Sequence, residues 1–265
     1  MGKIVRDSIS VLAHAFGYEV YKRTPRPDLL RLIEDLRPKN LGHRLIRIGA
    51  AGDGGYLVPD DLEGISCCVS PGVAESASFE MDLQRRGIPS ILADASVEQP
   101  PPNASGMPFE RRFIGLHDEG VMTTLDAWVA RHNCCVSGDL LLQMDIEGAE
   151  WTVLANVSSA LLRRFRIIVL ELHQLDLAAC PIVHRWMRSV LDRLDLIFEV
   201  AHVHPNNAGT IRRIAGLEIP STLEITLLRR DRVRHRGGLA QLPNPLDVPN
   251  DPNLSDISLA SWLNI

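Results

Sequence analysis

The segment from Leu140 to Trp151, LLLQMDIEGAEW, constrains the fold of this chain more than any other stretch. Apolar residues around one glutamine stop at Asp145 and Glu147, and an amphipathic helix then begins beyond Gly148, with Glu150 in its first turn. Such an apolar run is typical of a strand buried on both faces of a parallel sheet. An acid at the carboxyl end of such a strand lies in the crevice where open α/β sheets bind ligands. We therefore expect Asp145 at a ligand site, since a carboxylate there is costly to desolvate without a partner.

Length and composition favour a single soluble α/β domain. The 265 residues are 45% hydrophobic and 23% charged, which suffices for a large core. The formal net charge of −5 gives no general attraction to nucleic acid or to an anionic membrane surface. No apolar run approaches the roughly 20 residues of a membrane span, and the first 20 residues make a poor signal peptide. We therefore expect a cytoplasmic protein with neither nucleic acid nor membrane as its partner.

The number and spacing of the cysteines follow no known ligand or disulfide motif. They are Cys67, Cys68, Cys134, Cys135 and Cys180, an odd number with two adjacent pairs and no CxxC spacing. This pattern fits neither a set of disulfides nor a structural zinc site. We expect small, buried, apolar residues at these positions.

Strand and helix patterns alternate along the chain. Strands are expected over 64–72, 89–96, 111–117, 140–144, 166–173, 196–204 and 223–228, and helices over 5–20, 28–36, 75–87, 123–132, 149–157 and 181–194. This alternation predicts a mostly parallel, seven-stranded sheet. The last two strands lack an intervening helix and predict an antiparallel pair at one edge. We divide the single domain into a helical cap (1–45), a core (46–230) and a C-terminal tail (231–265).

Two glycine-containing turns are candidate ligand-binding segments. Around Asp53, Gly55 and Tyr56 four glycines fall within a short span, which indicates either a loop that approaches a ligand closely or a plain glycine-rich hairpin. The second turn, at Gly72, joins a strand to a helix, and Asp94 ends the next strand 22 positions later. That is about the distance at which nucleotide-binding units place their ribose-binding acid, although a generic βαβ unit with a surface aspartate remains the alternative.

The residue Glu75 separates two nucleotide chemistries. A dinucleotide pyrophosphate would sit on the helix N-terminus, where Glu75 places a carboxylate against it. This arrangement disfavours NAD. S-adenosylmethionine has no phosphate, and its sulfonium and ammonium groups are cations that an acid-lined crevice attracts.

Several motifs together resemble a known family. In chain order the motifs are DGGY, PGVAESASFE, Asp94, MDIEGAEW, LELH, HVHPNN and LPNPLDVPN. Together they resemble the FkbM-like group of class I S-adenosylmethionine-dependent methyltransferases. The resemblance covers roughly Arg47 to Asn250 and is most specific at DIEGAE, whereas Ser70 replaces the usual first glycine of the turn. It implies a Rossmann-like sheet in which the Ser70–Glu75 turn holds the methionine end, Asp94 the ribose and the segment 114–117 the adenine. The expected cofactor residues are Asp53, Gly55, Tyr56, Ser70, Gly72, Glu75, Ser76, Asp94, Gly115 and Asp145.

The acceptor hydroxyl must lose a proton, and two arrangements can remove it. Acids and histidines gather at strand ends in the sequence: Asp145, Glu171, His173, His202 and His204. His173, oriented by a neighbouring acid, is one candidate base. A magnesium ion bound by Asp145, Glu171 and His204 is the alternative, because a divalent cation lowers the pKa of a bound hydroxyl. The sequence leaves this choice open.

The expected activity is O-methylation of a sugar or glycoside by S-adenosylmethionine. The resemblance implies sugar or polyketide hydroxyls as acceptors and, among sugars, a methylated mannoside; the partner would then be a small molecule or an oligosaccharide. A homodimer is a further expectation. Two alternatives share the fold, namely a nicotinamide-dependent oxidoreductase and a non-catalytic nucleotide-binding module.

Overall fold

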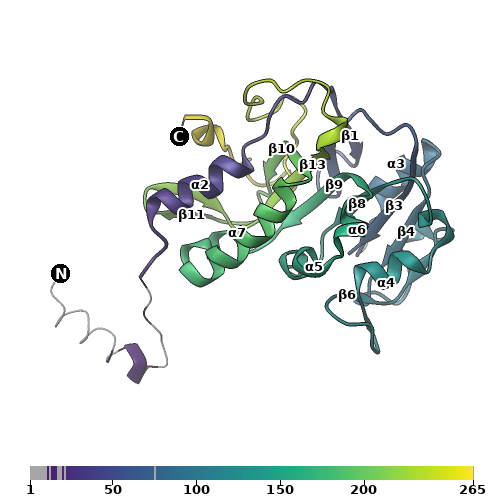
Figure 1. Cartoon of the computed structure of the whole chain (residues 1–265), viewed down its shortest axis with the longest axis horizontal. Coiled ribbons are helices and arrows are strands. Elements are labelled where there is room, and N and C mark those ends of the chain that lie inside the picture. The colour runs from purple at the N-terminus through teal and green to yellow at the C-terminus, as the bar shows by residue number, and fades with distance from the viewer. Residues whose placement is uncertain (1–10, 12, 17–19, 21, 75, 265) are drawn as a thin grey trace.

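The centre of the molecule is a seven-stranded sheet in the order β10-β13-β9-β8-β3-β4-β5 (Figure 1). The computed structural model describes residues 11, 13–16, 20, 22–74 and 76–264. The strands are β3 (Ile65–Pro71), β4 (Ser90–Ala93), β5 (Phe109–Glu110), β8 (Asp139–Met144), β9 (Phe165–Leu172), β10 (Phe198–Pro205) and β13 (Leu223–Arg229). All neighbours pair in parallel except β13, which runs antiparallel to both β9 and β10. The predicted α/β fold is confirmed, and the antiparallel strand lies second from the edge because β13 inserts between β9 and β10.

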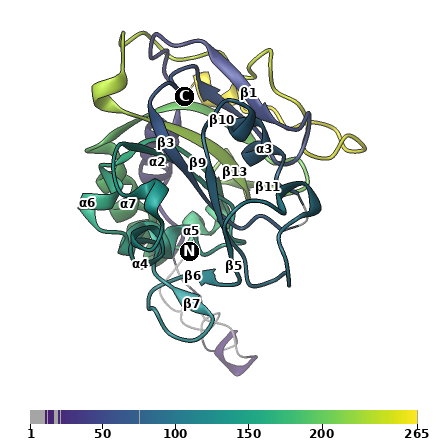
Figure 2. The same cartoon turned by 90° about the vertical axis from the view of Figure 1, so that its right-hand side faces the viewer.

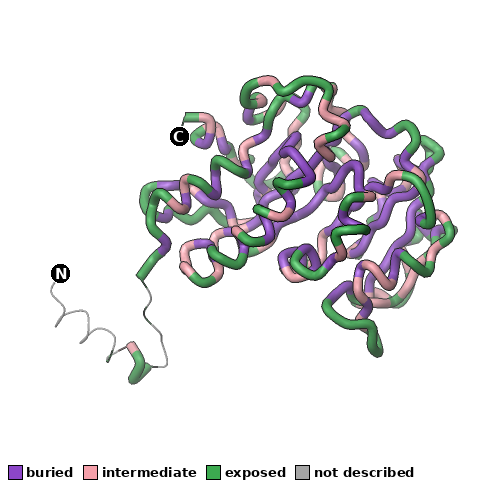
Figure 3. Tube along the Cα trace, in the orientation of Figure 1, coloured by how far each residue is buried: buried purple, intermediate pink, exposed green. Residues whose placement is uncertain are grey.

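Helices cover both faces of the sheet. They are α2 (Arg26–Leu36), α3 (Ser78–Arg85), α4 (Leu125–Ala130), α5 (Glu150–Asn156), α6 (Ser159–Leu162) and α7 (Pro181–Asp195). Apolar side chains of α2, α4, α5 and α7 form one large core with one face of the strands. On the opposite face, α3 packs together with a β-hairpin formed by β1 (Leu45–Gly49) and β2 (Gly55–Pro59). Buried residues accordingly follow the strands and the inner sides of the helices (Figure 3).

The longest of these helices, α7, shows how sequence sets the packing. Pro181 occupies its first turn, where the missing N–H costs no hydrogen bond. Met187, Val190, Leu191 and Leu194 follow at helical spacing and are buried. This stripe faces the sheet, so α7 fixes β9 and β10 relative to α5.

The structure differs from the predicted elements in two places. Instead of one strand over 111–117, the short β5 joins the main sheet, and β6 (Phe113–Ile114) pairs with β7 (Met122–Thr123) in a separate ribbon. The hairpin of β11 (Ile211–Ile214) and β12 (Leu217–Pro220) was not expected. The glycine-rich segment 47–59 forms a hairpin, and its approach to a ligand stays a prediction. The predicted helix over 5–20 lies mostly outside the described residues.

The remaining helical turns and the C-terminal segment complete the molecule. Short 3₁₀ turns are η1 (Pro102–Ala104), η2 (Asn133–Cys135), η3 (Leu175–Ala179), η4 (Arg230–Arg232) and η5 (Ala260–Asn264). The part of the C-terminal segment near Leu246 lies beside β1 (Figure 2), and Leu246 O accepts a hydrogen bond from Arg47 Nη2 at 2.8 Å. Trp262 in η5 is fully buried and donates its indole N–H to Glu218 O at 2.9 Å. The domain boundaries at 45/46 and 230/231 stay predictions. Within the described part of the chain, no helix combines the length and apolar character needed to cross a membrane.

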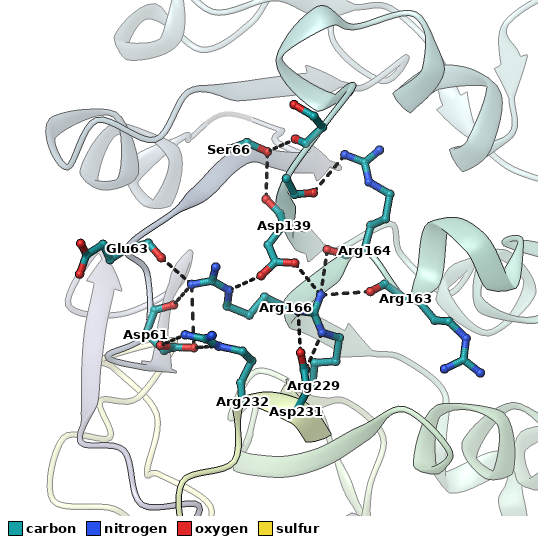
Figure 4. A network of polar contacts seen from close by, with 12 residues as sticks. Asp61, Glu63, Ser66, Asp139, Arg163, Arg164, Arg166, Arg229, Asp231 and Arg232 are labelled. Carbon is teal, nitrogen blue, oxygen red and sulfur yellow. Dashed lines mark hydrogen bonds and ion pairs between the residues drawn. The ribbon is translucent and has the colours of Figure 1, made fainter.

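A network of ion pairs closes the amino ends of β8 and β9 (Figure 4). Asp139 accepts hydrogen bonds from Arg166 Nε and Arg229 Nη1, each at 2.7 Å. Arg232 forms a two-point pair with Asp61, both distances being 2.7 Å. Both Asp139 and Asp61 thus have arginine partners, as a buried carboxylate requires.

Candidate active site

A cavity of about 320 Å³ lies beside the carboxyl ends of β3 and β8, against α3 and the β1–β2 hairpin. Its volume is within the range of roughly 300–1,000 Å³ that small-molecule pockets occupy. The lining residues are Asp53, Gly54, Tyr56, Gly72, Val73, Ala74, Ser76, Ser78, Phe79, Glu80, Gln143 and Asp145. Of the predicted cofactor residues, Asp53, Tyr56, Gly72, Ser76 and Asp145 therefore meet at one cavity. Their proposed role in binding stays a prediction.

Gly72 is required by the backbone itself. Its φ of +84° is a left-handed value, and a Cβ there would lie 1.5 Å from the carbonyl oxygen of Asp145. The turn after β3 and the turn after β8 therefore pass each other in backbone contact. This contact brings the glycine turn and Asp145 to the same cavity.

Gly55 is a glycine for a different reason from the one the sequence suggested. A Cβ at this position would lie 1.8 Å from the carbonyl oxygen of Ala50, so a side chain would clash with the hairpin rather than with a ligand. Gly54, not Gly55, lines the cavity. Replacing Gly55 by valine would consequently damage the hairpin itself.

Ser70 lies behind the cavity wall and not on it. The side chain is fully buried, its Oγ is 2.7 Å from Gln143 Oε1, and it also bonds to Glu80. Burial raises the pKa of Glu80, which favours its neutral form. Glu80 and Gln143 line the cavity and were missed as site residues, although Gln143 is the one polar residue in an otherwise apolar buried strand.

Three further predicted cofactor residues do not line the cavity or lie beyond description. Asp94 ends β4, and its two carboxylate oxygens accept hydrogen bonds from Ala74 N at 2.9 Å and Ser96 N at 2.8 Å. The carboxylate thus braces the turn beside the cavity, and its binding of ribose stays a prediction. Gly115 lies on the β6–β7 ribbon, where its N–H bonds to Thr123 O. Glu75 is outside the described residues.

Four polar residues form a row across the carboxyl-end half of the sheet. Strand register places Glu171 opposite Glu224 and Glu224 opposite His204. Asp145 directly follows Met144, which pairs with the residue before Glu171. The polar row, as we call Asp145, Glu171, Glu224 and His204, therefore extends over β8, β9, β13 and β10.

The pKa values of two acids of the polar row are raised. Burial, reinforced by the charges of Glu147 and Glu150 and opposed in part by His173, raises the pKa of Asp145 to about 6. Burial and the neighbouring Asp145 and Glu224 raise the pKa of Glu171 to about 9, so Glu171 holds a proton at neutral pH.

The carboxylates of Asp145 and Glu171 differ in their hydrogen bonds. Asp145 Oδ1 is buried and has no hydrogen-bond partner among the described residues. One oxygen of Glu171 accepts a hydrogen bond from Asn206 Nδ2 at 2.6 Å. A buried carboxylate oxygen without a partner is costly, and it marks where a ligand would bind.

His173 lies between acids above this row. Its Nδ1 is 3.3 Å from Glu150 Oε1 and 4.0 Å from Asp145 Oδ1, and its Nε2 is 4.0 Å from Glu171 Oε1. Burial alone would lower the pKa of His173, but the hydrogen bond with Glu150 and the surrounding acids outweigh it and raise the pKa to about 9. At neutral pH the imidazole therefore carries its proton, which is unfavourable for the predicted role as base.

Glu150 holds the turn between β8 and α5. Its carboxylate accepts hydrogen bonds from Ile146 N at 2.8 Å and Gly148 N at 3.1 Å, and the side chain is fully buried. Its negative charge complements the partial positive charge at the N-terminus of α5, as its position in the sequence suggested. Through His173 it also couples this turn to β9.

His202 and His204 anchor the C-terminal segment and do not reach the cavity lining. His202 Nε2 is 2.9 Å from Asp247 Oδ1. His204 lies between Glu224 Oε2 at 3.4 Å and Asp256 Oδ1 at 3.3 Å, which together raise its pKa against the effect of burial. The structure therefore gives both histidines acidic partners from a segment that sequence reasoning treated as a tail.

The predicted magnesium ligands are not the set that converges. Asp145, Glu171 and His204 lie along the polar row, but among the described acids and histidines the group whose ligand atoms all approach within 4.8 Å is Asp145, Glu150 and His173. Glu150 in this set is already engaged by two backbone amides. The polar-row residue Glu224 was missed, as was Asn250, whose Nδ2 donates to Glu224 at 2.5 Å.

The sheet with its inserted antiparallel strand, and the cavity at the carboxyl ends of its strands, define a class I methyltransferase fold. The chain belongs to the FkbM methyltransferase family: the family model for the methyltransferase FkbM domain matches residues 17–198. Among solved structures, one similar chain is described as a "putative RNA methyltransferase" from Pyrococcus horikoshii, with 12% identity, coverage of 77% of this chain and 97% of that chain, and a TM-score of 0.31. No curated protein matches the chain.

Proposed function

We propose that the protein is an S-adenosylmethionine-dependent O-methyltransferase that methylates a hydroxyl of a sugar or glycoside. The observation that carries this proposal is the excess of buried acid beside the cavity. Three acidic side chains, Asp145, Glu171 and Glu224, meet at one edge of the sheet. Burial and the negative charge of its neighbours keep Glu171 protonated, and the unpartnered Asp145 Oδ1 lies at the cavity wall. A cationic ligand would offset that charge.

The residues present fit this cofactor. Asp53, Asp145 and Glu80 line a cavity that the Gly72 turn keeps open, and Asp94 ends the neighbouring strand. When bound, S-adenosylmethionine supplies a methyl group on a positively charged sulfur. The protein's share of the work is to hold the acceptor oxygen in line with that methyl group, a positioning effect worth up to about 7 to 11 kcal/mol.

In this proposal Asp145 accepts the proton of the acceptor hydroxyl. A pKa of about 6 leaves it mostly ionised at neutral pH, close to the optimum for a general base. His173 keeps its own proton and stabilises the Asp145 carboxylate from 4.0 Å. Glu171 stays neutral, and Asn206 holds it in place.

Magnesium fits this site poorly. The converging set includes an imidazole nitrogen, whereas Mg²⁺ prefers an octahedron of oxygens, and the oxygens of Glu150 are already bonded to backbone amides. We therefore assign no step to a metal. A chelator such as EDTA should leave turnover unchanged; loss of turnover that magnesium restores would reinstate the metal arrangement.

A sugar acceptor is supported by the polar character of the surroundings. Carboxylates and amides such as Asn206 and Asn250 offer donors and acceptors of the kind that hydroxyl-rich ligands need. A methylated mannoside is the specific acceptor we would try first. A small-molecule or oligosaccharide partner, a cytoplasmic location and a homodimer stay predictions.

Two experiments test the proposal in order. Calorimetry should show binding of S-adenosylhomocysteine and no binding of NAD; the reverse result would favour an oxidoreductase, and binding of neither would favour a different class of ligand. Transfer of a labelled methyl group would then be measured onto mannosides, other glycosides and a polyketide alcohol. Label appearing as an O-methyl ether on a glycoside supports the proposal, and label on the polyketide alone contradicts the sugar assignment.

A further inference from the structure

Three of the five cysteines converge at a place remote from the polar row. Cys67 comes from β3, and Cys134 and Cys135 come from the turn η2, yet their sulfur atoms all lie within 4.8 Å of one another. Cys67 Sγ is 3.1 Å from Cys134 Sγ, and Cys134 Sγ is 3.8 Å from Cys135 Sγ. We call these residues the thiol triad. The sequence did not predict the thiol triad, because 66 residues lie between Cys67 and Cys134 along the chain.

Packing alone does not account for the triad. Adjacent residues of a strand point to opposite faces, so Cys67 and Cys68 separate, and Cys68 belongs to the core on the other side of the sheet. Cys180 lies apart at the start of α7. In contrast, the sulfur atoms of both Cys134 and Cys135 in η2 lie close to Cys67 Sγ. Cys67 and Cys135 are buried, and Cys134 is half-buried, which leaves one approach to the triad.

The donor set has a specific chemistry. Within the described residues the converging group contains three sulfurs and neither histidine nor carboxylate. Soft thiolate ligands select soft cations such as Cu(I) and Zn²⁺. Zn²⁺ in structural sites takes four ligands at a metal–sulfur distance of about 2.3 Å. A planar, three-coordinate ion with bonds of roughly that length would separate its sulfurs by about 4 Å. The Cys134–Cys135 distance of 3.8 Å is close to this value, and the Cys67–Cys134 distance of 3.1 Å would have to lengthen when the ion binds.

We propose that Cys67, Cys134 and Cys135 form a three-coordinate binding site for Cu(I). Each cysteine that ligates the ion transfers its thiol proton to solvent and forms a sulfur–copper bond. Copper stays in its +1 state and the sulfurs stay reduced, so no oxidant or reductant is consumed.

The site would act separately from methyl transfer. Cys67 lies in the same strand that ends at the Gly72 turn, but the triad occupies the opposite half of that strand and the face that packs against the helices. The proposal therefore does not rest on the proposed function, and failure of either leaves the other intact.

The test is an anaerobic titration of the full chain with Cu(I) in competition with bicinchoninate. We expect one copper per chain and a sulfur-to-copper charge-transfer absorbance in the ultraviolet. Cys134→Ser is the informative variant, since its half-buried position makes it the least disruptive to folding. It should lose affinity by more than the roughly 10- to 100-fold that removal of an outer-shell partner costs. Cys180→Ser is the matched control and should bind as the unchanged protein does.

Three outcomes would overturn the proposal. The first is that the unchanged protein, with its thiols reduced, binds no copper. The second is equal affinity in Cys134→Ser and Cys180→Ser. The third is that equimolar Zn²⁺ displaces Cu(I), which would indicate a fourth ligand and a different site.

Discussion

The two ends of the central strands carry polar clusters of opposite design. At the amino ends, Asp139 of β8 meets Arg166 of β9 and Arg229 of β13, and each acid has a guanidinium beside it (Figure 4). At the carboxyl ends, Asp145 and Glu171 lie beside Glu224, and acid meets acid. β8 and β9 thus begin at a cluster in which Asp139 has two arginine partners, and they end at a cluster of acids with His173 between two of them.

The pKa directions express this difference. Burial would raise the pKa of Asp139, but Arg229 and Arg166 lower it below its usual value. At the other end His173 opposes burial only in part, and the pKa values of Asp145 and Glu171 rise to about 6 and about 9. The first cluster is neutralised on folding, whereas we propose that a cationic ligand completes the second.

The largest effect is expected from Asp145→Asn. Loss of the general base should reduce kcat by roughly 10²- to 10⁴-fold with the fold intact, because the amide is of similar size and cannot accept the proton. The measurement is methyl transfer together with the unfolding midpoint. Glu147→Gln is the matched control, since that side chain is 88% exposed in the same turn and should retain most activity. Equal losses in the two variants would remove Asp145 from this role.

Arg166→Met tests the opposite end of the strands. It strips Asp139 of one partner and removes hydrogen bonds to Asp61 O and Glu63 O. Breaking such a buried pair should cost about 3 to 5 kcal/mol of unfolding free energy. Denaturant unfolding measures that cost, and kcat/KM per folded molecule should not change. A variant that is stable but inactive would contradict the division between the two ends.

Asp94→Ala should weaken cofactor binding by about 1.5 to 3 kcal/mol through loss of a charge-assisted pair to the ribose. Calorimetry with S-adenosylhomocysteine measures the change. Ser96→Ala is the control, because it removes only the hydroxyl that bonds to Asp94 Oδ1 at 2.6 Å. If both variants lose the same affinity, Asp94 acts by bracing the turn and not by contacting ribose.

The two clusters should also give opposite pH dependences of stability. Glu171 and His173 have folded pKa values raised to about 9, so their contribution is present at low pH and is lost as pH rises toward 9. Asp139 and Asp61 have lowered pKa values, so theirs is lost as pH falls through those values. Each group changes the free energy of unfolding by at most about 1.4 kcal/mol per pH unit. Glu171→Gln should flatten the alkaline loss, and Asp139→Asn the acid loss; a ligand-free protein equally stable at pH 7 and pH 9 would contradict this.

Strands and helices that depend on local sequence pattern were predicted well from the sequence. The apolar run before Asp145 predicts a buried strand, and the helix after it follows from spacing and an acidic first turn, so Asp145 was placed at the cavity from sequence alone. Glu171 and His173 followed from the same reasoning on the next strand. Strand order near one edge was also accessible, because β10 and β13 have no helix between them.

Long-range pairing was not accessible from the sequence. Glu224 joins the polar row only because β13 inserts between β9 and β10, which no local pattern specifies. His202 has Asp247 as its partner and His204 has Asp256, which lie 45 and 52 positions further along the chain. The protonation of His173 likewise depends on Glu150, whose orientation is set by the backbone amides of a turn. The thiol triad was missed for the same reason, since β3 and η2 meet only in the folded chain.

The central claim is that bound cofactor neutralises the polar row, and proton release on binding tests it most directly. Calorimetry at pH 8 in two buffers of different ionisation enthalpy would measure the protons exchanged when S-adenosylmethionine binds. We predict release from Glu171, because a nearby cation lowers its pKa from about 9. The release should be smaller for S-adenosylhomocysteine, which lacks the sulfonium charge, and should vanish in Glu171→Gln. Binding enthalpies that do not depend on the buffer, or equal release with the two ligands, would contradict the account.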